Sequence, residues 1–147
     1  MKIKLLKNEK DEKAKMPLRA TDGAAGYDLH AFIDESVTIN PGCLAVIPTG
    51  VVIEIPDKDT AGFIFGRSGL GIKSGIMPSN AVGVIDSDYR GEIKVGLCNV
   101  SDKPYTINKN DRIAQLVFMP VLGPVFEESE ELSVTFRSEK GFGDSGR

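Results

Sequence analysis

The sequence contains one histidine, His30, and two cysteines, Cys43 and Cys98, among 147 residues. A lone histidine without a neighbouring cysteine or second histidine cannot form a usual metal site, so we expect His30 to be a bystander. The cysteines lack CxxC spacing, which favours buried free thiols in a reducing compartment over a disulfide. A Ser-His-Asp set, a zinc cluster and a Walker loop are all missing from the sequence. The sequence therefore lacks the residues needed for hydrolysis by a protein nucleophile or by a zinc ion.

An excess of positive charge is also missing. The net charge is −3 and the pI is about 5.2, which argues against a general nucleic-acid binder. Basic residues that matter are expected to act locally, on a small anion. We find no signal peptide and no membrane-length apolar run, so we expect no membrane association. The predicted location is cytoplasmic, or nuclear or elsewhere inside a host cell if the source is eukaryotic or viral.

Long helical periodicity is absent, and short β-rich runs alternate with turn residues instead. The length suits one domain with a real core. Strands about every 8 to 12 residues, broken by Gly, Pro, Asn and Asp, predict an all-β barrel or jelly roll. Pro48-Thr49-Gly50 is expected to form a turn, and one short helix is expected to begin with Ser68 as its N-cap and to end at Gly75. The runs predicted as strands are 36–39, 44–47, 51–55, 61–65, 104–107, 112–119 and 132–136.

Residues 80–92 carry the strongest functional signal. The apolar run 81–85 ends in Asp86, and alternation resumes at 93–97, which predicts a β-hairpin. Its loop holds two carboxylates, an aromatic ring and a guanidinium within five residues. Asp86 could serve as a carboxylate base beside the ring of Tyr89. With a phosphate-binding segment, these are components for hydrolysing a nucleotide with water as the nucleophile.

That phosphate-binding segment is predicted at 66–70, where a strand leads into the start of a helix. Arg67, Ser68 and Gly69 place a guanidinium, a hydroxyl and a free amide there, which suits a phosphate. The alternative is a capped turn with a surface arginine. Further along the chain, Arg112 opens an alternating strand and is expected to pair with a carboxylate. Asp28 is expected to have a structural role and is the candidate partner of Arg112.

The chain changes character from Gly123. Residues 123–131 are predicted to be an exposed arm that leads to the last strand, so the barrel domain spans 1–122 and the arm and tail span 123–147. The tail 137–147 contains three glycines and one aromatic ring. Such a tail is either a disordered end or a flap that folds over a ligand. Arg137 and Phe142, set among the glycines, favour considering the flap.

Five segments together resemble the motifs of trimeric dUTP pyrophosphatases (dUTPases), in the family's order. They are 24–29 (AAGYDL), 66–70 (GRSGL), 83–91 (GVIDSDYRG), 111–115 (DRIAQ) and 141–146 (GFGDSG). The resemblance implies a jelly-roll-like β-barrel of the β-clip type, with one short helix, that assembles as a homotrimer. It also implies three shared sites, each taking the hairpin from one subunit, the cradle from a second and the tail from the third.

The resemblance implies a role for each matching residue. Asp86 would be the general base for the water that attacks the α-phosphorus of dUTP, which yields dUMP and pyrophosphate. Tyr89 would lie beneath the deoxyribose, where a ribose 2′-hydroxyl would collide. Mg²⁺ would be held by the triphosphate oxygens and water. Uracil would bind at Gly83, Val84, Ile85, Lys94 and Asn80; the phosphates at Arg67, Ser68, Gly69, Gln115 and Arg137; and Phe142, with Gly143 and Ser145, would close the flap over the uracil.

The tail departs from the family pattern in one respect. Ser138 and Lys140 stand where glycines are common, and Asp144 replaces a more usual serine or histidine. Two other functions remain open on the residues: a dCTP deaminase-like relative that shares the barrel and the trimer, and a catalytically silent trimeric nucleotide-binding module. The first would need a glutamate near the base, whereas the hairpin offers an aspartate and a tyrosine.

Overall fold

The computed structural model describes residues 1–135, so the predicted flap, including Arg137, Phe142, Gly143 and Ser145, lies outside the described residues. The chain folds into two four-stranded antiparallel sheets and a short two-stranded one. The elements in chain order are β1 (Lys2–Leu5), β2 (Tyr27–His30), β3 (Val37–Ile39), β4 (Leu44–Glu54), β5 (Thr60–Phe65), α1 (Ser68–Ser74), β6 (Ile76–Pro78), β7 (Gly83–Ile85), β8 (Ile93–Asn99), β9 (Tyr105–Ile107) and β10 (Arg112–Pro120).

The two larger sheets have the orders β1-β4-β8-β6 and β2-β10-β5-β7, and β3 pairs with β9. Alternating aliphatic side chains of these strands meet in one core. On β8, for example, Ile93, Val95 and Leu97 are buried while Lys94 is exposed. This period-2 pattern is what places one face of a strand in the core. The predicted all-β fold with one short helix is confirmed.

The predicted turn at Pro48-Thr49-Gly50 is wrong, because β4 runs through it as one strand of 11 residues. The pairing of β4 with β8 shifts register between Pro48 and Val51, which marks a β-bulge. Gly50 takes a left-handed φ of 66° there, and Thr49 Oγ1 donates to the carbonyl of Ile93 at 2.6 Å. The breaker residues therefore bend a continuous strand instead of ending it.

The predicted β-hairpin is also wrong in its pairing. β7 pairs with β5, whereas β8 lies between β4 and β6. The loop 86–92 therefore crosses from one sheet to the other. The ends of β7 and β8 that flank this loop line a common cleft, which is described below.

The helix begins one residue earlier than expected. Arg67, with extended backbone angles, is the N-cap, and Ser68 is the first helical residue. The C-terminal prediction is confirmed, because Gly75 ends α1 in the left-handed conformation with φ 66°. A Cβ on Gly75 would lie 2.8 Å from the backbone nitrogen of Ser101, so the close packing there also favours glycine.

The expected burial of both cysteines is only partly right. Cys43 is exposed and Cys98 is half-buried, and both are free thiols. Leu44 is the residue of β4 that pairs with Cys98 of β8, and Cys43 lies one residue before β4 begins. The two cysteines are therefore not paired opposite each other across the two strands.

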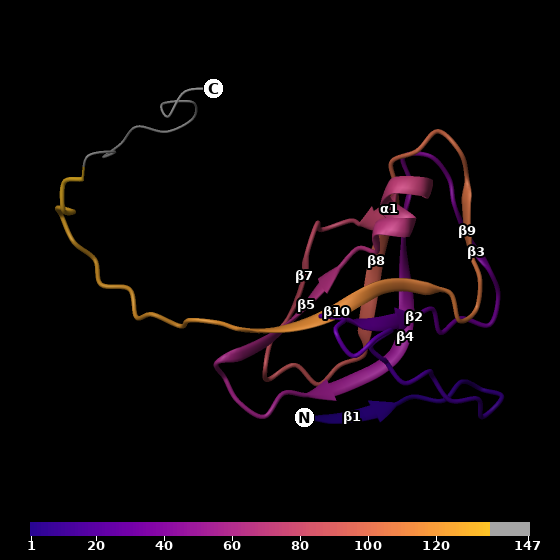
Figure 1. The fold of residues 1–147 in the computed structure, drawn as a ribbon, viewed down its shortest axis with the longest axis horizontal. Helices are drawn as coiled ribbons and strands as arrows, with labels where there is room; N and C mark the ends of the chain where they lie inside the picture. Colours follow the sequence, from indigo (N-terminus) through magenta and orange to yellow (C-terminus); the bar gives the residue numbers. More distant parts are fainter. Residues whose placement is uncertain (136–147) are drawn as a thin grey trace.

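After β10 the chain leaves the barrel and runs away from it as an extended arm (Figure 1). Residues 132–135, predicted as part of the last strand, have no strand assignment in this single chain. The arm exposes large apolar side chains almost completely: Leu122, Val125, Phe126, Leu132 and Val134. No helix within residues 1–135 is long and apolar enough to span a membrane.

Candidate active site

The loop 86–92 and the ends of β7 and β8 enclose a cleft of about 230 Å³. Five of the residues predicted for the nucleoside line it: Val84, Ile85, Asp86, Tyr89 and Lys94. Two other predicted residues lie beside it. Gly83 is buried within β7 and faces Ile64 of β5, and Asn80 lies in the turn before β7, where its carbonyl accepts from the Val82 amide.

The loop holds its own shape through backbone contacts. The Tyr89 amide donates to the Asp86 carbonyl at 3.2 Å, which closes a turn. Arg90 Nη1 donates to the carbonyls of Ser87 at 2.7 Å and Tyr89 at 2.9 Å. Arg90 therefore braces the loop, while the exposed carboxylate of Asp86 stays accessible to water.

Glu92 lines the same cleft and was missed by the sequence analysis. Its Oε1 accepts from the Gly50 amide at 2.8 Å, and its Oε2 lies 3.7 Å from Lys94 Nζ. The Glu92 carbonyl accepts from the Tyr89 hydroxyl at 3.0 Å. Glu92 thus connects the loop to the bulge of β4. Only the bulge, which the sequence analysis mistook for a turn, would have revealed this partner.

The predicted phosphate cradle forms a second cleft, of about 220 Å³. Arg67, Ser68, Gly69 and Gln115 line it together, with Asp28, Gly26, Ala20 and Ala24 from the 20–28 segment. Ser68 and Gly69 are exposed at the start of α1. Gln115 Nε2 donates to the Gly66 carbonyl at 2.9 Å, which fixes the amide beside the helix start.

Asp28 joins the two arginines of this cleft. Its Oδ1 accepts from Arg67 Nε at 3.0 Å and its Oδ2 from Arg112 Nη1 at 3.2 Å. Arg67 Nη1 also donates to the Arg112 carbonyl at 3.3 Å. The Asp28 side chain is 15% exposed, so the carboxylate is well shielded. Asp28 is therefore the partner expected for Arg112, and it also orients Arg67.

His30 lies opposite Arg112 in the pairing of β2 with β10. Its Nδ1 is buried and has no hydrogen-bond partner among residues 1–135. Burial, and then the nearby charge of Lys15, lowers the pKa of His30 below its ordinary value of 6.5. A neutral imidazole at this position fits the bystander role predicted for it.

The two clefts lie at opposite ends of the β5–β7 pair. Asp86 follows Ile85, which pairs with Gly62 near the start of β5, whereas Arg67 follows the end of β5. Arg67 lies five residues after Gly62, which is roughly 15 Å of extended chain. A triphosphate is much shorter than that. One chain therefore holds the two parts of the predicted site without joining them.

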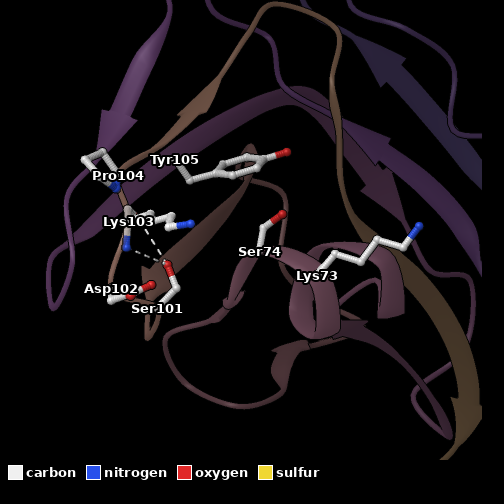
Figure 2. Close-up of a pocket in the computed structure, with 7 residues that line it drawn as sticks. All are labelled: Lys73, Ser74, Ser101, Asp102, Lys103, Pro104 and Tyr105. Carbon is white, nitrogen blue, oxygen red and sulfur yellow. Dashed lines mark hydrogen bonds between the residues drawn. The ribbon is translucent and has the colours of Figure 1, made fainter.

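A larger cavity, of about 320 Å³, lies elsewhere on the molecule. Figure 2 shows it between the end of α1 and the loop 101–105, with Tyr105 above Ser74. Ser101 Oγ donates to the Lys103 carbonyl at 3.0 Å and so closes this loop on itself. The lining contains no residue that the sequence predicted for the site, so cavity size alone does not identify the active site here.

Comparison with known proteins identifies related chains over the whole length. The dUTPase family model matches residues 12–146. Deoxyuridine 5′-triphosphate nucleotidohydrolases of Desulfitobacterium hafniense and Haemophilus ducreyi are each 47% identical over 99% of this chain, and the matches cover 97% and 95% of those proteins.

Solved structures give the same result at the level of the fold. The dUTPase of Staphylococcus bacteriophage 80alpha with dUpNHpp superposes with a TM-score of 0.84 at 31% identity, and the match covers 99% of both chains. A dUTPase variant from phage phi11 of S. aureus, described with a structural Mg(II) ion, has a TM-score of 0.76 at 27% identity over 91% of this chain and 100% of that one. This likeness confirms the predicted jelly-roll fold.

Proposed function

This chain belongs to the dUTPase family, and from that premise we propose that it hydrolyses dUTP to dUMP and pyrophosphate by attack of a water molecule on the α-phosphorus. The reaction makes the chain a dUTP diphosphatase. It lowers the concentration of dUTP and supplies dUMP as a precursor of thymidylate. The observation that carries the proposal is the cleft that gathers Asp86, Tyr89 and the facing ends of β7 and β8.

Asp86 is the general base in this proposal. Its carboxylate is exposed on the loop and lies in the same cleft as the side chain of Tyr89. An ionised carboxylate that is open to water can orient a water molecule and accept its proton. The ring of Tyr89 forms a wall of the cleft, so a deoxyribose packed against it would leave no room for a 2′-hydroxyl.

Uracil is recognised by strand backbone in this proposal. β7 is the last strand of its sheet among the described strands, and Val84 and Ile85 line the cleft together with Ile93 and Lys94. Unpaired amides and carbonyls at the edge of β7 can pair with the carbonyls and the N3–H of uracil, as they would with an added strand. Cytosine presents the reversed donor and acceptor pattern, and a site built on such pairing rejects it strongly.

Arg67, Ser68, Gly69 and Gln115 bind the phosphates. Arg67 is held by Asp28 through Nε, so its orientation is fixed before substrate arrives. A fixed guanidinium loses little freedom when it binds an anion and offers a charge-assisted fork. Gln115, anchored to Gly66, orders the α-phosphate or the attacking water. Arg137, Phe142, Gly143 and Ser145 complete the site as a flap.

We further propose that three copies assemble and that each site combines the loop of one chain with the cradle of a second. The separation of the two clefts in one chain supports this. So does the outer face of the sheet, where Leu44, Val46 and Met77 are exposed around Gly96 and Cys98. The exposed apolar side chains of this sheet face and of the arm 121–135 would be removed from water by contact with neighbouring copies.

Mg²⁺ accompanies the substrate in this proposal. Residues 1–135 contain no cluster of three or more His, Cys, Asp or Glu side chains that could hold a metal ion. The cradle offers cationic and neutral donors, which suit phosphate oxygens. An ion held by the triphosphate and water would reduce the negative charge of the phosphates. The location proposed for this activity is intracellular, where deoxynucleotides are used.

The two alternative functions, a dCTP deaminase-like relative and a silent nucleotide-binding module, are not favoured. The related proteins are named deoxyuridine 5′-triphosphate nucleotidohydrolases. One assay tests all three. The pure protein is incubated with each deoxynucleoside triphosphate, and with UTP, in Mg²⁺ or in excess chelator, and pyrophosphate and ammonia are measured. Pyrophosphate from dUTP alone, dependent on Mg²⁺, is expected. Ammonia from dCTP, or no product from any nucleotide, would contradict the proposal. A native mass of one chain at micromolar concentration would exclude the shared sites.

A further inference from the structure

The ring of Tyr89 rests on the backbone of Gly91. A Cβ added to Gly91 would lie 2.3 Å from Tyr89 Oη, 2.5 Å from Cζ and 2.9 Å from Cε2. Contacts below 3.0 Å are essentially never made by a real Cβ. Any residue other than glycine at this position would therefore push the ring away.

Gly91 is required for the ring and not for the backbone. The three atoms nearest to the added Cβ all belong to Tyr89. The left-handed glycines of the described chain are Gly42, Gly50 and Gly75, so Gly91 takes a backbone conformation that other residues also adopt. An alanine at this position would meet one obstacle, the aromatic ring.

The far end of the ring is fixed as well. Tyr89 Oη donates to the Glu92 carbonyl at 3.0 Å. The Glu92 carboxylate, in a side chain that is 19% exposed, accepts from the Gly50 amide in the bulge of β4 at 2.8 Å. The ring is thus attached through Glu92 to β4. Its remaining surface lines the cleft together with Asp86.

We propose that Gly91 is a positioning residue that determines sugar specificity through Tyr89. Because Gly91 has no Cβ, the Tyr89 ring can lie directly against the backbone of residue 91. At that depth the cleft has room for a deoxyribose on the ring, whereas the 2′-hydroxyl of a ribose would collide with it. Alanine would have to lift the ring by about 1 Å to reach ordinary van der Waals separation. This inference rests on the proposed function, because it assumes that Tyr89 faces the sugar of dUTP.

The test compares kcat/KM for dUTP and UTP in four proteins: the wild type, Gly91→Ala, Tyr89→Ala and the double variant. Gly91→Ala should lower kcat/KM for dUTP by roughly 10- to 100-fold, since a misplacement of about 1 Å can have an effect of this size. The change should fall mainly on KM. The ratio of kcat/KM for dUTP to kcat/KM for UTP should fall. UTP already binds poorly in the wild type, so a displaced ring should weaken its binding less than that of dUTP.

The double variant separates a positioning role from a general one. If Gly91 acts through the ring, adding Gly91→Ala to Tyr89→Ala should change kcat/KM by no more than about twofold. Gly23→Ala is the matched control, because a Cβ there meets nothing within 4 Å, and it should behave as the wild type. An unchanged nucleotide ratio in Gly91→Ala, or the same loss with and without the ring, would overturn the inference.

A substitute variant and the wild-type assay allow failure of this inference to be distinguished from failure of the proposed function. If Gly91→Ala yields no folded protein, Tyr89→Phe takes its place, because losing the bond to the Glu92 carbonyl frees the ring to rise. It should narrow the nucleotide ratio by a smaller factor, and an unchanged ratio would count against the inference. The wild type tests the proposed function separately: failure to hydrolyse dUTP would refute that function whatever the variants do.

Discussion

Asp28→Asn tests whether one carboxylate supports both the fold and the phosphate cradle. Asparagine keeps the shape of Asp28 but removes the charge that two guanidinium groups share. A hydrogen bond to a charged group contributes about 1.5–3 kcal/mol. Arg67 is 26% exposed and should lose most of this, whereas Arg112 is 50% exposed and should lose much less. We expect the free energy of unfolding to fall by about 2–4 kcal/mol.

The loss should be visible as a melting temperature about 5–15 °C lower, because each kcal/mol corresponds to roughly 2–4 °C for a domain of this size. KM for dUTP should rise more than kcat falls, since Arg67 loses its fixed orientation while Asp86 is untouched. Circular dichroism melts and steady-state kinetics measure both effects. Asp102→Asn, at an exposed carboxylate in the loop 101–105, is the control and should change stability by less than about 0.5 kcal/mol. A melting temperature within 2 °C of the wild type, or an unchanged KM, would refute the role assigned to Asp28.

Two other substitutions and one deletion test separate parts of the molecule. Asp86→Asn should lower kcat by about 10²- to 10⁴-fold while calorimetric binding of a non-hydrolysable dUTP analogue stays nearly normal, because the amide cannot accept the proton of water; more than a tenth of normal kcat would mean another base. Deletion of 137–147 should lower kcat by orders of magnitude with little change in native mass or melting temperature, since the proposed flap acts only on bound nucleotide; full activity of the shortened chain would leave the tail without a catalytic role. Burial lowers the pKa of His30 below 6.5, so the unfolded chain binds the proton more readily and the free energy of unfolding should decline as the pH falls below about 6.5. His30→Gln should flatten that decline in denaturant titrations at pH 5 to 7, and an identical pH profile in the variant would contradict the assignment.

Local patterns predicted the strands whose apolar runs are bounded by strong turn residues. β5 and β10 match their predicted runs within one residue, because Gly66 follows the first run and Asn110 and Asp111 precede the second. The breaker residues at Pro48 to Gly50 were misread for a physical reason. The Ile93 carbonyl accepts from Thr49 Oγ1 and the Glu92 carboxylate accepts from the Gly50 amide, so acceptors from a distant part of the chain hold β4 together through the bulge. Such partners cannot be seen in a window of a few residues.

Most of the described residues predicted for the site gather in two clefts, whereas the pairing of the strands beside the loop 86–92 was predicted wrongly. Asp86 and Tyr89 share one cleft and Arg67 and Gln115 share another, as their motifs indicate. β7 and β8 belong to different sheets and do not pair with each other. The turn residues of the loop 86–92 would look the same in a hairpin and in a crossing between sheets, so the sequence could not distinguish the two. Glu92 and Gly91 gave no local signal, because their importance comes from the Gly50 amide and the Tyr89 ring that they contact.

The distance between the two clefts has a consequence for inheritance. If each site joins the loop of one chain to the cradle of a neighbour, a chain with a defective loop and a chain with a defective cradle are each inactive alone. In a mixed trimer the intact loop of one can meet the intact cradle of the other, so about one site in three becomes whole again. Two null alleles of this gene would then complement each other within the protein itself. Alleles that damage the same cleft would not.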